Sequence, residues 1–204
     1  MRMFVQLFVV TVLLSWTVGV VAQQPAGKPA PTPAPQSSAA KPAPPQPQFR
    51  PVATIQEIMA TMIDPASKIV FGAVGTTATN GVEQQKEPKT DEEWAVVRKN
   101  ALLMIEGSNL IMMSGRHVAA PSLANKAGAG ELTAAQIETR LAKDRAAWNK
   151  LAREFGVAAG AALKAADAKS PDGVMESGEG IDAACENCHL RFWYPDQEKL
   201  FQKK

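Results

Sequence analysis

Side chains that could hold a metal ion on their own are scarce in this 204-residue chain, which has two cysteines and two histidines. A structural zinc site needs about four protein ligands, so a cysteine pair with so few companions does not favour zinc. The net charge is only +2 at pH 7 with histidine neutral. Because no basic cluster accompanies it, this charge does not indicate a nucleic-acid-binding protein. We find no internal repeat and no alternating Val/Ile/Thr run that would predict a strand.

The first 22 residues have the composition of an export signal. Arg2 precedes a long apolar run that ends at Ala22. Val20 and Ala22 fit the small-residue pattern of a cleavage site, while the run also approaches the ~20 residues that cross a bilayer. The sequence therefore predicts an exported, periplasmic protein, with residues 1–22 either cleaved as a signal peptide or kept as a membrane anchor. Export places the chain in an oxidising compartment.

Residues 23–51 consist almost entirely of Pro, Ala, Gln and Ser. Such a segment cannot bury enough apolar area to offset the entropy lost on ordering. We expect a disordered, extended linker, followed by one folded domain over residues 52–204.

The first two helices predicted in this domain each open with a capping box, Thr54 with Glu57 and Thr90 with Glu93. The first is expected to kink or restart at Pro65 and to end at Gly75. Its apolar positions recur in steps of three and four: Ile55, Met59, Met62, Ala66, Ile69 and Ala73. Residues 76–89 are expected to form a polar loop with a turn at 80–81. The second helix should stop near residues 114–115, with an apolar stripe of Trp94, Val97, Ala101, Met104, Ser108 and Ile111.

Two further helices are predicted in the second half of the domain. One runs from Thr133 to Ala168, with Asp144 as the single polar residue on its apolar stripe. The other has Ser170 as its cap and Pro171 as its first residue. The stripe of this last helix is Val174, Gly178, Ile181, Cys185, Cys188 and Phe192. Four amphipathic helices predict an all-α fold, an antiparallel four-helix bundle.

The two cysteines and a histidine form a CxxCH motif, Cys185, Cys188 and His189. On a helix the three side chains share one face within about one turn. CxxC followed directly by His is the signature of covalent haem c attachment, in which the cysteines form thioethers and the histidine ligates the iron. A disulfide after export and a redox-active dithiol are the alternatives, although a thioredoxin-like pair belongs to an α/β fold.

A CxxCH motif in the last helix of a four-helix bundle, with Phe192 three residues after His189, resembles the cytochrome c′ family of class II c-type cytochromes. The resemblance spans roughly residues 53–195. It implies one covalent haem held by Cys185 and Cys188, with His189 as the proximal iron ligand. It also implies pairing of two copies into a homodimer through their first two helices. One departure is Trp193, which stands where many members carry a basic residue.

The other axial position decides the expected function. The resemblance implies a ligand from the first helix, and Met59 matches that position best, with Met62 as the second choice. A thioether raises the haem potential and closes the iron to small ligands, so His/Met ligation predicts a one-electron carrier that is not an enzyme. An iron facing only apolar side chains would instead bind a small gas such as nitric oxide or carbon monoxide. A peroxidase-like site would need a proton-handling group, for which only His117 is available.

Overall fold

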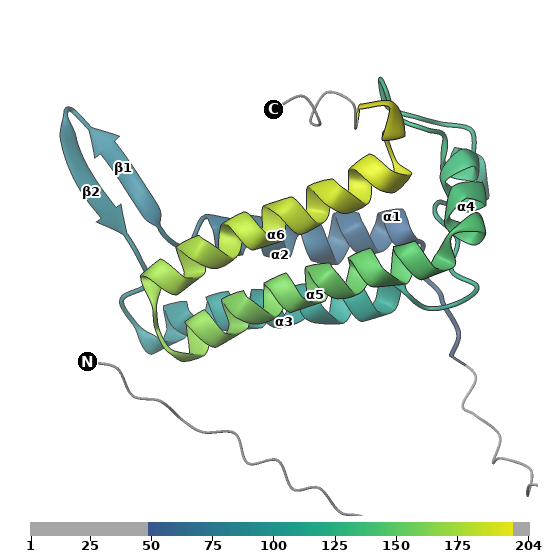
Figure 1. Ribbon diagram of the computed structural model, residues 1–204. Coiled ribbons are helices and arrows are strands. Elements are labelled where there is room, and N and C mark those ends of the chain that lie inside the picture. Colours follow the sequence, from purple (N-terminus) through teal and green to yellow (C-terminus); the bar gives the residue numbers. More distant parts are fainter. Residues whose placement is uncertain (1–48, 198–204) are drawn as a thin grey trace, which may run out of the picture. The chain divides into compact units, whose positions relative to one another are not determined.

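Helices make up most of the described chain, which is residues 49–197 of a computed structural model (Figure 1). The predicted signal or anchor and nearly all of the predicted linker lie outside these residues, as does the tail 198–204. Within residues 49–197 no helix is both long enough and apolar enough to span a membrane. The helices in residues 49–197 confirm the mostly helical fold expected from the sequence, and one small β element was not expected.

The first helical segment is interrupted where the sequence predicts one kinked helix. α1 (Ile55–Ile58) begins at the predicted capping box, and Thr54 accepts from the Glu57 N–H. It continues as a π-helical turn, η1 (Met59–Ile63), and then as α2 (Asp64–Phe71), whose C-cap is Gly72 rather than Gly75. The Asp64 N–H donates to the Met59 carbonyl, five residues back. The next residue, Pro65, has no N–H to continue an ordinary ladder, so the wider turn ends there.

The π turn changes which residues of α2 face the core. It adds one residue to the turn, so the buried positions continue at Ile63, Ala66 and Val70. The predicted stripe continued instead through Ile69, which is 45 % exposed. The prediction was right at Ala66 and wrong at Ile69, because it assumed an unbroken 3.6-residue period.

A two-stranded hairpin replaces the predicted polar loop. β1 (Gly75–Thr79) pairs antiparallel with β2 (Val82–Lys86). Asn80 and Gly81 form the two-residue connection with φ of 54° and 79°, the left-handed geometry that tight hairpins require. The strands lack an alternating apolar face, which explains why periodicity missed them. In Figure 1 the hairpin projects beyond the ends of the helices.

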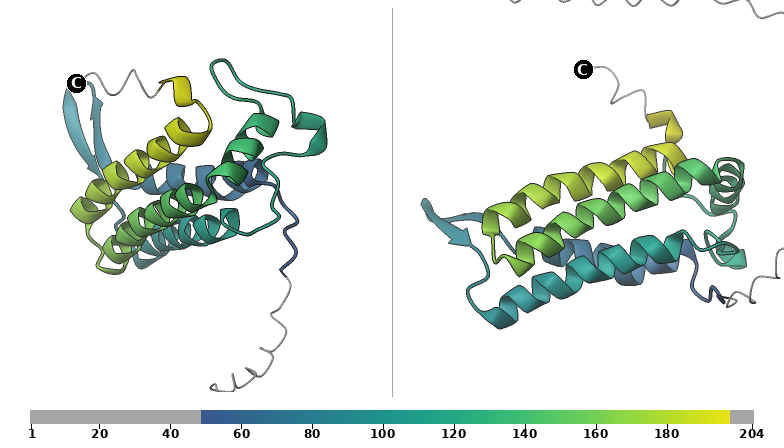
Figure 2. Two further views of the ribbon diagram at one scale, coloured as in Figure 1. Left: turned by 45° about the vertical axis from the view of Figure 1, so that its right-hand side comes forward. Right: turned by 60° about the horizontal axis from the view of Figure 1, so that its bottom comes forward.

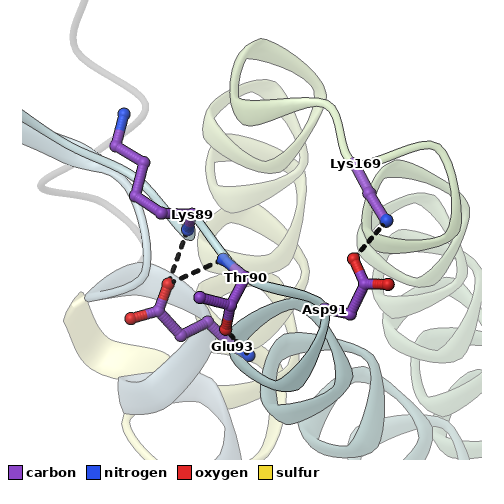
Figure 3. A network of polar contacts seen from close by, with 5 residues as sticks. All are labelled: Lys89, Thr90, Asp91, Glu93 and Lys169. Atoms are coloured by element: carbon purple, nitrogen blue, oxygen red, sulfur yellow. Dashed lines mark hydrogen bonds and ion pairs between the residues drawn. The ribbon is translucent and has the colours of Figure 1, made fainter.

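α3 (Asp91–Ile111) follows the second predicted capping box, and every residue of its predicted stripe is buried. Figure 3 shows this start from close by: Glu93 Oε2 accepts from the Lys89 and Thr90 backbone N–H groups at 2.5 and 3.1 Å. Beside it, Lys169 Nζ lies 2.5 Å from Asp91 Oδ1. This ion pair joins the start of α3 to the turn between the last two long helices.

The predicted third helix is two helices, α4 (Ala134–Lys143) and α5 (Arg145–Asp167). Asp144 between them has non-helical φ and ψ of −132° and 58°, and its side chain accepts from the Ala147 N–H at 3.2 Å. Aspartate competes in this way for backbone donors and favours caps. The one polar residue on the predicted stripe is thus a helix cap, and the prediction of a single helix was wrong.

α6 (Pro171–Phe192) completes the body, with the predicted Ser170 cap and proline in the first turn, and short 3₁₀ turns lie at Pro121–Leu123 and Pro195–Gln197. α3 packs on α5 and α5 on α6, while α2 contacts both α3 and α6 (Figure 2). Residues from α2, α3, α5 and α6 contribute to one hydrophobic core. α5 and α6 are antiparallel and close: a Cβ built on Gly173 would lie 3.0 Å from Ala165 Cβ.

Candidate functional site

α6 brings the CxxCH residues to one side of the core. Cys188 is 7 % exposed, whereas Cys185 and His189 are only partly buried. The inward stripe of α6 runs through Ala184 rather than through Cys185. The sequence analysis placed Cys185 on the inward stripe of α6, and this was wrong. Cys185 lies beside that stripe, next to Ala184. All three residues nevertheless line the same cavity.

This cavity has a volume of about 280 Å³, close to the lower end of pockets that hold small molecules. Its wall is built by five segments: Met59 from η1, Phe71 from α2, Ile111 from α3, Phe155 from α5 and Cys188 from α6. The lining is mostly apolar. The space therefore suits an apolar group better than a small polar substrate.

Small side chains keep the cavity open beside the cysteines. Ala152 on α5 and Ala184 on α6 both line it and are both buried. A larger residue at either position would extend into the space, because buried side chains pack at crystal-like density. The alanine-rich character of α5 thus leaves room next to the motif.

A second hollow of about 240 Å³ adjoins the first. Met59, Asp64 and His189 line both spaces, and Trp193 lines only the second. Met59 and His189 therefore stand at the boundary between the two hollows, one from η1 and the other from α6. The resemblance had named Met59 as the residue opposite His189, and the structure brings both side chains to the same two spaces.

The two candidate methionines point to different neighbours. Met59 lines the cavity that contains the motif, whereas Met62 does not. The sulfur of Met62 would lie 3.6 Å from a Cβ built on Gly107, so Met62 faces α3. Only Met59 is thus brought together with His189 and the cysteines.

Both thiols are free and protonated at neutral pH. Burial raises the pKa of Cys185 to about 11, and the nearby carboxylates of Asp182 and Glu186 act in the same direction. Burial also raises the pKa of Cys188 to about 12, with Cys185 adding to the effect. Reactive dithiols need a lowered pKa, so these surroundings disfavour a thioredoxin-like role.

His189 is held in its neutral form by its surroundings. Burial lowers the pKa of the imidazole, while Glu186 and Glu131 act in the opposite direction. The neutral imidazole is the form that ligates metals. The local environment therefore suits a histidine that ligates a metal better than a charged surface histidine.

Aromatic residues pack around this end of α6. Trp148 is fully buried, donates from Nε1 to the Ile111 carbonyl at 3.0 Å, and meets Phe192 edge-on at 5.3 Å. Trp193 stacks on Trp148 with centroids 6.2 Å apart. The short C-terminal sequence FWY was the available signal, but its packing needed the tertiary structure.

Two acidic residues in the cavity wall were also missed. Asp182 lies three residues before Cys185 on the same helix, a spacing from which it could have been found. Asp64 reaches the cavity from the start of α2 and pairs with Lys68 at 2.7 Å. Its position follows from the π turn, which no sequence pattern indicated.

His117, the remaining candidate, lies elsewhere, and so does Arg191 at the end of α6. The side chain of His117 is 72 % exposed and its Nδ1 lies 2.7 Å from Glu138 Oε1, away from the cavity. Arg191 donates from Nη2 to Asp144 Oδ2 at 2.7 Å, at the end of α6. Neither residue lines the space beside the cysteines.

No group of three or more His, Cys, Asp or Glu side chains that could hold a metal ion by themselves occurs within residues 49–197. A haem iron does not need such a group, because the porphyrin supplies four of its ligands. Comparisons with protein-family models, with curated proteins and with solved structures each return no match.

Proposed function

We propose that this protein is an exported, monohaem c-type cytochrome that carries one electron at a time and is built as a cytochrome c′-like four-helix haem bundle. One observation carries the proposal: Cys185, Cys188, His189 and Met59 line a single, mostly apolar cavity. The three motif residues come from one helix, whereas Met59 comes from a segment about 130 residues earlier in the chain. The periplasm follows from the predicted export signal.

The residues of the cavity fit haem c. Cys185 and Cys188 would hold it through two thioethers, and both are free of other bonds. His189 and Met59 would be the axial iron ligands. Haem c supplies an iron that exchanges one electron between its ferrous and ferric states. The mostly apolar wall, Phe155 included, would surround the haem with groups of low polarity and so favour the reduced state, which carries less charge.

The role of Met59 decides between an electron carrier and a gas-binding protein. A thioether on the iron leaves no open position for an external ligand. Met59 packs against the core from η1 and is only partly exposed. No catalytic group is needed for this role, and His117 is paired with Glu138 outside the cavity.

The first test is mass spectrometry of the full chain purified after export in a host that attaches haem c. We expect the mass of one covalent haem, lost in Cys185→Ser/Cys188→Ser. A chain with an intramolecular disulfide and no haem would refute the proposal. The predicted cleavage after Ala22 is read from the same spectrum.

The second test compares Met59→Ala with Met62→Ala, two substitutions of the same size on neighbouring turns. The reduced wild-type protein is expected to be low-spin and indifferent to carbon monoxide. Met59→Ala should become sensitive to the gas, whereas Met62→Ala should not, because Met62 faces α3. A wild-type spectrum that shifts on addition of carbon monoxide would favour the gas-binding function over the carrier.

A further inference from the structure

The chain folds back over His189 where α6 ends. The N–H groups of Trp193 and Tyr194 both donate to the His189 carbonyl, at 2.7 and 3.1 Å. This turn brings both rings against the imidazole, with centroids 5.8 Å away for Trp193 and 5.9 Å for Tyr194. The interplanar angles are 61° and 51°, so neither ring is stacked flat on the imidazole. The two aromatic rings thus restrict how His189 can rotate.

A hydrogen bond between Tyr194 and Glu186 fixes the second ring. The Tyr194 hydroxyl donates to Glu186 Oε2 at 2.8 Å. Glu186 lies three residues before His189 on α6, hence on the same side of the helix. Tyr194 is the only tyrosine of the chain. The bond holds Tyr194, two residues beyond the end of α6, against the helical turn that carries His189.

Trp193 is anchored independently. Its carbonyl accepts from the Leu132 N–H at 2.8 Å, and its ring stacks on the buried Trp148. Trp193 is 9 % exposed. Loss of the Tyr194 bond therefore frees one ring and the Glu186 carboxylate while Trp193 stays in place.

We propose that the Tyr194–Glu186 pair is a positioning device for His189: it sets the orientation of the imidazole and holds a carboxylate charge beside it. The inference rests on the proposed function, in which His189 is an iron ligand. Groups around a ligating histidine set its ring orientation and its basicity. A negative charge near the imidazole strengthens electron donation to the iron and lowers the reduction potential. Glu131, from the segment before α4, contributes a second charge near the ring.

The test uses the full chain with its haem attached and measures midpoint potential, ferric electron paramagnetic resonance and haem content. Glu186→Gln keeps an oxygen that can accept from Tyr194 but removes the charge. We expect it to favour the reduced state by about three- to tenfold, the order expected for one partly screened charge. Tyr194→Phe keeps the ring and removes the bond. It should shift the potential in the same direction by less and change the resonance g values, because the imidazole gains freedom.

Glu179→Gln is the matched control, since it removes one exposed carboxylate from the same helix without touching the site. It should leave both readouts unchanged. The double variant Tyr194→Phe/Glu186→Gln should shift the potential by less than the sum of the single shifts, because both act on one interaction.

The possible failures are separable. Equal potentials and equal g values in wild type, Tyr194→Phe and Glu186→Gln, with full haem content in all three, would overturn the inference and leave the proposed function standing. A wild-type protein without covalent haem would overturn both. If Tyr194→Phe does not fold, the comparison of Glu186→Gln with Glu179→Gln decides: equal potentials in those two variants overturn the inference.

Discussion

Replacing Gly107 by alanine tests how closely α3 approaches the π turn that carries Met59. A Cβ built at Gly107 would lie 2.6 Å from Ile63 Cγ1 and 3.0 Å from its Cδ1. Ile63 is 4 % exposed and lies in the turn itself, so its side chain has little room to move aside. The added methyl must therefore push η1 away from α3.

The expected change in the free energy of unfolding of Gly107→Ala is the sum of two opposing contributions. Overpacking a well-packed core costs about 1–3 kcal/mol. Alanine in place of glycine within a helix contributes about 0.5–1 kcal/mol in the other direction. Gly107→Ala should therefore lower the free energy of unfolding by about 0–2.5 kcal/mol. Gly160→Ala on α5 is the control, because nothing lies within 4 Å of its built Cβ, and it should raise the free energy by about 0.5–1 kcal/mol.

The difference between the two variants isolates the overpacking, since the helix-propensity term is common to both. Urea unfolding of the full chain, followed by the helical circular dichroism signal, measures that difference provided the slopes agree. We expect the free energy of unfolding of Gly160→Ala to exceed that of Gly107→Ala by about 1–3 kcal/mol. Two variants within about 0.5 kcal/mol of each other, the usual range of surface substitutions, would refute the close approach of η1 to α3.

Three further predictions concern residues outside that contact. Thr90→Ala removes the side-chain cap of α3 and should cost about 0.5–2 kcal/mol of unfolding free energy. Trp148→Phe leaves the Ile111 carbonyl without its indole donor in a buried position, so we expect a loss of about 1–3 kcal/mol by the same denaturation. The hydrogen bond from Arg191, followed by that from the Ala147 N–H, lowers the pKa of Asp144. Its stabilising effect is therefore present at neutral pH and lost as the pH falls below the ordinary aspartate range, so Asp144→Asn should flatten the acid side of the stability profile.

Each of these predictions can fail in its own way. A Thr90→Ala variant as stable as Thr90→Ser would show that the hydroxyl cap contributes nothing to α3. Unchanged stability of Trp148→Phe would mean that water replaces the indole donor. An acid limb in Asp144→Asn identical to that of the wild type would assign the acid sensitivity to other carboxylates.

Local chemistry along the sequence was enough to predict the beginnings of several helices. The capping boxes at Thr54 and Thr90 depend on residues only three apart, and the structure confirms both. The Ser170 cap before Pro171 is confirmed for the same reason. The pair Asn80 and Gly81 was a hairpin signal as well as a turn signal, but the exposed strands gave no apolar alternation to support it.

The sequence by itself determined the spacing of Cys185, Cys188 and His189 on one helix, because residues three and four apart share a helical face. It could not determine what that face meets. The π turn before Pro65 shifts the inward face of the residues that follow Met59, so that Ile63 is buried and Met62 lies against α3. The end of α6 brings Tyr194 back to Glu186 across His189. These relations depend on how distant segments pack, and packing is decided by the whole core rather than by any local period.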